Sequence, residues 1–303
     1  MKRFNVLDSF AIKIIAMITM AFDHIGVIYG ALWNQGMASP FYVTCRYIGR
    51  IAMPLYCFML VEGVLHTRSY KKYAGKLSLI ALLITGFLMF CYFGPVQELY
   101  GISSQGNIFL DLLLGSLMIY VLNHKNNYIK LIAIIPIAIS ILSFTAKCVE
   151  QANSCQGCAY TFNVLWYPKF LRLQYDWLSL ALMLCFYFAY KGAKLFYKIR
   201  EEAYGILADT VEGTNEYRIA TNIIGLILSM IPTAGYYMIK YFAPNIVWWA
   251  PNIQIFAIAA SVILLFYSGQ RGYNKKWFNI FSYLYYPVHI LLIYGICYLI
   301  YLV

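Results

Sequence analysis

The sequence predicts an all-α integral membrane protein, a polytopic bundle of about nine transmembrane helices that forms a single domain over residues 1–303. Hydrophobic residues make up 62% of its 303 residues and charged residues only 12%, whereas soluble globular chains have about half and about a quarter. The apolar runs are long and continuous rather than alternating, which excludes a transmembrane β-barrel. Each helical crossing needs ~20 residues, so no sizeable soluble domain fits beside the helices.

Nine apolar runs bounded by charged, proline or glycine residues are expected to cross the membrane. The first run follows Met1-Lys2-Arg3 without a small-residue cleavage site, so we expect a retained helix rather than a signal peptide. The segment at about 194–218 mixes apolar and acidic residues, which predicts a solvated connector or a short helix on the membrane surface. The nine runs lie near 10–32, 41–65, 74–94, 107–123, 129–147, 175–193, 219–241, 247–268 and 280–302.

Membrane topology explains the net charge of +11 better than a nucleic-acid partner does, because cytoplasmic loops of membrane proteins are enriched in lysine and arginine. A cytoplasmic N-terminus places sixteen cations on the inner side and only four on the outer side, which are Lys147, Lys169, Arg172 and Lys240. We therefore expect a multi-pass protein of the cell membrane, surrounded by its lipids, with a cytoplasmic N-terminus and an extracytoplasmic C-terminus. No nucleic acid is expected as a partner, and the oligomeric state stays open.

The first run carries three ionisable residues, Lys13, Asp23 and His24, which are functional candidates because charge at membrane depth is costly. Eleven residues span about three helical turns, so Lys13 and His24 share one helix face ~16 Å apart. An imidazole titrates near neutrality, as a general base for an amine or hydroxyl requires. The alternatives are a Lys13 that extends to the inner surface and a His24 that is only hydrogen-bonded in the core.

The second run returns across the membrane and carries Arg46, Arg50 and Glu62. A rise of ~1.5 Å per residue places Arg50 level with Asp23, and Glu62 level with Lys13. Two ion pairs between the helices are therefore expected. The alternative is that these pairs only hold the first hairpin together.

Two prolines are expected to distort spans next to polar groups. Pro54 leaves the Arg50 carbonyl without its helical hydrogen bond. In the last run, Pro287 frees another carbonyl, and His289 lies near mid-membrane. A second histidine beside a kink predicts a polar cavity shared with His24, although a kinked helix whose His289 bonds to a neighbour is as plausible.

Polar residues also mark both ends of the bundle. Asn107 and Asp111 begin the fourth run and Gln174 and Asp176 the sixth, at the same outer level. They are expected either to line an entrance for an acceptor or to cap the helices.

On the inner side, Glu62 and His66 lead into the cations Arg68, Lys71 and Lys72. Such a cluster can hold the phosphates of a cytosolic nucleotide-like donor. Positive-inside topology and anionic lipid are the alternatives.

The cysteines do not indicate a metal site. Cys148, Cys155 and Cys158 share the expected outer loop, where one disulfide is plausible in an oxidising compartment. A zinc site lacks an obvious fourth ligand, and no metal is expected.

Several motifs together resemble the TraX family, which is named for a membrane protein that N-acetylates conjugative pilin. They run from Ile12 to Met17, from Phe22 to Gly26, from Gly49 to Pro54, from Val61 to Thr67, from Gly106 to Phe109 and from Tyr286 to His289. The Lys13-x10-His24 spacing is also similar to the signature of the membrane-bound acyltransferases of family 3.

The resemblance implies transfer of an acyl group, typically from cytosolic acetyl-CoA or another acyl-CoA, to an amine or hydroxyl acceptor at or across the membrane. The acceptor can be a peptide, a glycan or a lipid, and transfer can be direct or through an acyl-histidine. The alternatives are a transporter or channel with an intramembrane charge relay, and a membrane scaffold. The expected catalytic residues are His24, Asp23, Arg50 and His289, and the expected substrate-binding residues are Lys13, Glu62, His66, Arg68, Lys71, Lys72, Asn107 and Tyr286.

Overall fold

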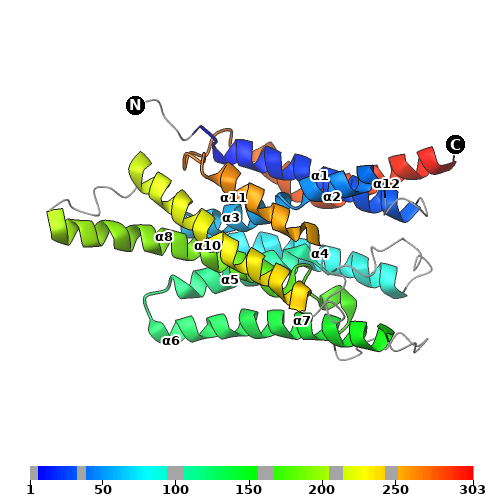
Figure 1. Cartoon of the computed structure of the whole chain (residues 1–303), viewed down its shortest axis with the longest axis horizontal. Coiled ribbons are helices and arrows are strands. Elements are labelled where there is room, and N and C mark those ends of the chain that lie inside the picture. Colours follow the sequence, from blue (N-terminus) through cyan, green and yellow to red (C-terminus); the bar gives the residue numbers. More distant parts are fainter. Residues whose placement is uncertain are drawn as a thin grey trace.

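The computed structural model describes residues 6–32, 39–93, 106–155, 167–204, 214–242 and 252–302. These parts are helical and are joined by short connections, and the β-type pairing among them is a single bridge between Leu7 and Tyr267. The long helices run along one axis of the molecule (Figure 1). The chain is therefore an all-α multi-pass membrane protein, as the sequence predicts.

Seven segments of the described chain are long and apolar enough to cross a membrane. Each of the nine predicted runs contains a helix, but two of these helices, at Ile108–Leu122 and Gln254–Leu264, are shorter. The seven segments are α1 (Ser9–Leu32), α2 with α3 (Pro40–Gly49 and Ala52–Leu65), α4 (Tyr70–Phe93), α6 with η2 and α7 (Asn127–Lys130, Leu131–Ala133 and Ile134–Cys155), η3 with α8 (Lys169–Leu171 and Asp176–Tyr204), α10 (Asn215–Phe242) and α12 (Lys276–Leu302).

The two shorter apolar segments are packed within the bundle. Helix α5 (Ile108–Leu122) contacts α3, α4 and α8, and η4 (Asn252–Ala257) with α11 (Ile258–Leu264) contacts α10 and α3. At ~1.5 Å per residue, α5 is shorter than the ~30 Å hydrocarbon layer. Neighbouring helices cover it, so its ends need not reach the membrane surface.

The predicted second span is two helices rather than one. The chain turns at Arg50 and Ile51, whose backbone N–H groups bond to Tyr47 and Ile48 at 3.2 Å each. Pro54 lies in the first turn of α3, where a missing N–H costs no intrahelical bond. Gly49 is needed at the end of α2, because a Cβ there would overlap the side chain of Asp23.

Helix α12 includes Pro287 without an interruption of its helical residues. One other sequence expectation needs correction. Residues 194–204, expected in a connector, instead extend α8 (Figure 1), because nothing in that sequence ends the helix before Tyr204. Cys148 has a free thiol, while the predicted disulfide with Cys155 or Cys158 involves side chains outside the described residues.

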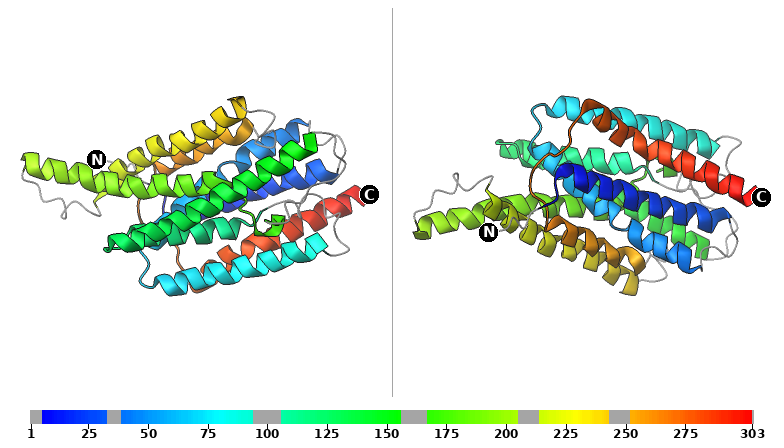
Figure 2. Two further views of the ribbon diagram at one scale, coloured as in Figure 1. Left: turned by 90° about the horizontal axis from the view of Figure 1, so that it is seen from below. Right: turned by 90° about the horizontal axis from the view of Figure 1, so that it is seen from above.

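The core lies between α1, α3, α5 and α8. Ile12, Leu55, Met118 and Met183, one from each of these helices, are fully buried. Helix α12 is the least buried of the seven segments and lies beside α1 at the edge of the bundle (Figure 2). Its outer face exposes large apolar side chains, as contact with lipid requires.

Candidate functional site

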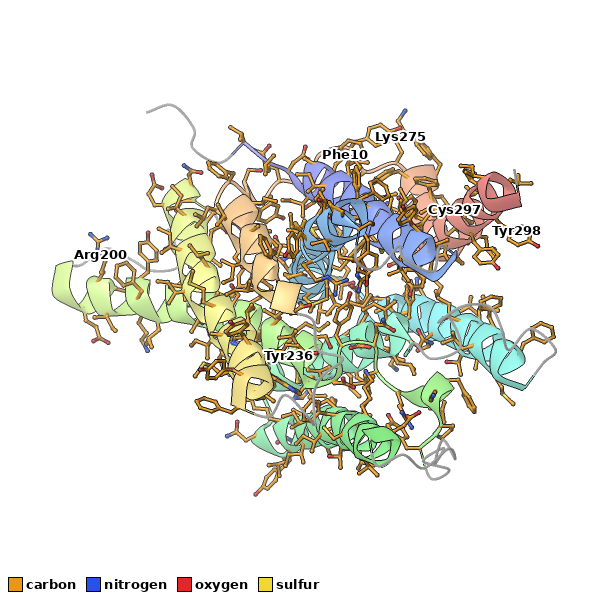
Figure 3. All side chains as sticks on the ribbon, turned by 45° about the vertical axis from the view of Figure 1, so that its right-hand side comes forward. Phe10, Arg200, Tyr236, Lys275, Cys297 and Tyr298 are labelled. Carbon is orange, nitrogen blue, oxygen red and sulfur yellow. The ribbon has the colours of Figure 1, made fainter. Side chains whose placement is uncertain are left out.

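A polar cavity of about 400 Å³ lies between α1, α2, α3, α5 and the start of α8. It occupies the half of the bundle where α1 ends and α5 and α8 begin. Tyr236, which lines it, lies centrally in Figure 3, whereas Arg200 and Lys275 lie at the periphery. Its ionisable and polar lining residues include Asp23, His24, Arg46, Arg50, Lys147, Gln174, Asp176, Gln254 and Tyr286.

Two arginines of the α2–α3 segment bind one carboxylate of α1. Arg50 NH2 lies 2.5 Å from Asp23 Oδ1, and Arg46 NH1 lies 2.8 Å from Asp23 Oδ2. The predicted pair between Asp23 and Arg50 is thus confirmed, and Arg46 joins it. Arg50 also donates to the Arg46 carbonyl at 3.3 Å and to Gln254 Oε1 at 3.4 Å. All three charged side chains are held in one network in the cavity wall.

Two histidines from opposite ends of the chain meet beside this network. His24 Nδ1 lies 2.6 Å from His289 Nε2, and His289 Nδ1 lies 2.6 Å from the Tyr285 carbonyl. A carbonyl only accepts, so His289 Nδ1 carries a proton and a neutral His289 accepts at Nε2. His24 then donates from Nδ1 and keeps the lone pair of Nε2. We assign this tautomer from the hydrogen-bond chain.

His24 is the member of the pair that lines the cavity, together with Tyr286. Their rings pack edge to face with centroids 5.9 Å apart. His289 lies behind His24 and does not line the cavity. The geometry therefore allows His24 Nε2 to accept a proton from a bound group while His289 holds the ring.

The outer polar residues divide between helix capping and the cavity wall. Asp111 accepts from the backbone N–H groups of Gln174 and Tyr175 at 2.7 and 3.1 Å, and from Ser179 Oγ at 2.6 Å. Asn107 caps α5 by accepting from Phe109 N at 2.9 Å. Neither Asn107 nor Asp111 lines the cavity, which favours the capping interpretation for these two residues.

Gln174 and Asp176, by contrast, line the cavity. Asp176 accepts from Ser143 at 2.7 Å and from Lys147 at 2.9 Å. Its backbone has a φ of 50°, a left-handed conformation that is uncommon for residues other than glycine. These contacts fix the start of α8 at the wall of the cavity.

The predicted pair between Glu62 and Lys13 is wrong. Glu62 accepts from Tyr190, from Tyr267 at 3.0 Å and from Arg218 at 3.4 Å. Lys13 Nζ instead approaches Asn279 Oδ1 at 3.5 Å. The prediction used only the level of the two residues along their helices, whereas Lys13 faces α12 and Glu62 faces α8, α10 and Tyr267.

The structure does not bring the basic cluster to the cavity. Arg68, Lys71 and Lys72 are exposed at the far end of α3 and the start of α4, ~20 Å of helix away from the cavity-lining residue Ala52. His66 lies beside them, with Nδ1 2.9 Å from the Glu62 carbonyl. Lys13, like His24, does face α12, as their spacing predicts.

Sequence reasoning missed Gln254, which is buried and bonded to Arg50 in the cavity wall. It also missed Tyr236 and the part of Arg46 in binding Asp23. An uncharged amide in the apolar run 247–268 was the available signal, but no polar side chain of that run was weighed as a candidate.

Comparison with known proteins places these residues in a family. The family model described as TraX protein matches residues 9–297. The probable fimbrial assembly protein FimC, serogroup H1, of Dichelobacter nodosus is 34% identical over 82 residues. This match covers 26% of the chain and 31% of that protein. No solved structure matches the chain.

Proposed function

From the premise that this chain belongs to the TraX family, we propose that it is an integral membrane acyltransferase. It moves an acyl group, in the simplest case acetyl, from cytosolic acyl-CoA to an amine or hydroxyl acceptor at or across the membrane. The observation that carries the proposal is His24, which lines the cavity and whose Nδ1 is bound by His289, so that Nε2 keeps its lone pair.

In the proposed reaction, His24 Nε2 takes the proton of the acceptor amine or hydroxyl as that group attacks the thioester carbonyl carbon. The carbonyl electrons move to oxygen, and the positive charge of Arg50 in the cavity wall stabilises the oxyanion through space. Its collapse breaks the carbon–sulfur bond. The thiolate of CoA leaves and takes the proton from His24, which returns to its starting state.

Each further residue has a distinct role in this scheme. Asp23 holds both arginines in place, and Tyr286 forms the wall beside His24. The donor's phosphates bind at the basic end of the bundle, and its arm passes Lys13, which lies on the same face of α1 as His24. His289 acts through His24 and is a positioning residue.

Two lines support a peptide acceptor over a glycan or a lipid. The TraX family is associated with pilin acetylation, and the name of the Dichelobacter nodosus relative describes fimbrial assembly. The proposed role is therefore modification of a pilin-type subunit, or another step of pilus assembly, in the membrane.

Mass spectrometry of membrane and secreted peptides from cells with and without the protein tests this function. Cells with the wild-type chain should carry an acetyl-sized addition that is missing from cells with His24→Gln. Purified protein should release one CoA for each acceptor modified. Ion flux in liposomes without consumption of acyl-CoA would instead identify a transporter or channel.

A further inference from the structure

Two hydrogen-bond donors in the cavity wall are buried without a partner among the described residues. They are Nε of Arg46 and Nε2 of Gln254. Gln254 is only 4% exposed, and both residues line the cavity. An unsatisfied buried donor destabilises the folded protein, and more so when it is charged. This part of the cavity wall is therefore suited to bind a group that accepts hydrogen bonds.

The side chains of Arg46 and Gln254 belong to one network in the cavity wall. Arg46 and Arg50 both donate to the carboxylate of Asp23, and Arg50 also donates to Oε1 of Gln254 and to the backbone carbonyl of Arg46. These bonds use the acceptor of the Gln254 amide and turn its N–H groups away from Arg50. All three nitrogens of the Arg50 guanidinium already have acceptors. The donors that remain available to a ligand are therefore Nε of Arg46 and Nε2 of Gln254.

The charge of the lining adds a second requirement. The cavity-lining residues carry three cationic side chains, Arg46, Arg50 and Lys147, and two anionic ones, Asp23 and Asp176. Lys147 is paired with Asp176, whereas Asp23 is shared by both arginines. One positive charge is left uncompensated. A neutral carbonyl would satisfy the donors but not this charge, which is costly to bury unpaired.

We infer that the corner formed by Arg46 and Gln254 is a binding subsite for an anionic oxygen group, a carboxylate or phosphate, of the acceptor. This inference deepens the proposed function, and the statement that the anion belongs to the acceptor rests on that function. The cavity lies at the end of the bundle opposite the basic cluster where the donor's phosphates are proposed to bind. The anion bound here is accordingly the acceptor's, and it positions the acceptor in the cavity that His24 also lines.

Thermal unfolding of the purified protein in nanodiscs tests the subsite without any turnover, with inorganic phosphate as the probe against chloride at equal ionic strength. A ligand that binds the folded state raises the melting temperature. Phosphate should raise that of the wild type, and Arg46→Gln should abolish the rise. Gln254→Glu places a carboxylate beside the uncompensated charge. It should melt higher without phosphate and need at least about tenfold more phosphate for the same shift.

Gln270→Glu is the matched control, because Gln270 is exposed and does not line the cavity. Its phosphate response should equal that of the wild type. A wild type that does not respond, or a Gln254→Glu protein that melts lower and responds like the wild type, would overturn the subsite.

Two further arms separate the possible failures. If Arg46→Gln weakened binding of CoA but not of pantetheine, which lacks phosphate, the anion would be the donor's and the assignment to the acceptor would be wrong. His24→Gln should keep the phosphate response and lose transfer. Transfer at the wild-type rate in that variant would reject the proposed mechanism and leave the subsite standing.

Discussion

His24 Nδ1 of the first helix lies 2.6 Å from His289 Nε2 of the last helix. The Tyr285 carbonyl fixes the direction of this contact, because it accepts from the other nitrogen of His289. The chain of bonds selects one tautomer of His24, in which Nδ1 donates and Nε2 keeps its lone pair, and His24 is a lining residue of the cavity. Two positions 265 residues apart thus define one candidate base.

The first prediction concerns His24. A general base contributes ~10²–10⁴-fold to turnover, so His24→Ala and His24→Gln should each lower kcat by about that factor. Gln is polar but does not take up the proton. Binding of acyl-CoA, measured by equilibrium titration, should stay near the wild-type value. Wild-type turnover in a well-folded His24→Gln protein would make His24 a structural residue.

A second prediction separates positioning from chemistry at His289. His289→Gln keeps a side-chain oxygen that can accept from His24, whereas His289→Leu removes it. We expect kcat to fall in the order wild type, His289→Gln, His289→Leu, with little change in KM for the donor. A purely structural role would lower the melting temperature of both variants without this order in kcat.

The third prediction is about stability and concerns Asp111. Its carboxylate accepts three hydrogen bonds at the start of α8, two of them from backbone N–H groups. Asp111→Asn replaces one accepting oxygen by an NH2 group that faces another donor. It should lower the free energy of unfolding by ~2–4 kcal/mol. Asp8→Asn is the control, because Asp8 accepts from a single backbone N–H at 2.8 Å. We expect this variant to lose about 1 kcal/mol or less of the free energy of unfolding. Thermal unfolding in micelles measures both, and equal losses would contradict this account.

The fourth prediction is topological. An N-terminus in the cytoplasm and an odd number of crossings place the two ends on opposite sides of the membrane. Reporter fusions after Lys125, between α5 and α6, and after Val303 should then report opposite sides. If both reported the same side, the separation of donor and acceptor entrances would have to be abandoned.

The fold class and the central part of the site could be predicted from sequence, and the failures have physical causes. Charged residues stand out in apolar helices, so the pair of Asp23 with Arg50 followed from spacing along single helices. For His289 the alternative of a bond to a neighbour fits, because His289 bonds to His24 and to the Tyr285 carbonyl and is not among the lining residues of the cavity. The pair of Glu62 with Lys13 failed because spacing gives the level of a side chain but not the neighbour it faces, and the two side chains face different helices. Gln254 was missed because an uncharged amide stands out less than a charge in an apolar run. Its role in the site depends on Arg50, which tertiary packing brings next to it.

The last prediction concerns the exposed cations at the start of α4. If acyl-CoA approaches through them, Lys71→Glu with Lys72→Glu should raise the Kd for CoA and make the remaining affinity less sensitive to salt, because screening acts on exposed charges. The fold should survive, since both side chains are exposed. Lys275→Glu with Lys276→Glu is the matched control, with the same change of charge on exposed residues at the start of α12, and it should leave the Kd unchanged. Titration of CoA at low and high salt gives both values. Equal Kd values for all three proteins at low salt would mean that Lys71 and Lys72 serve topology alone, and that the donor reaches His24 by another route.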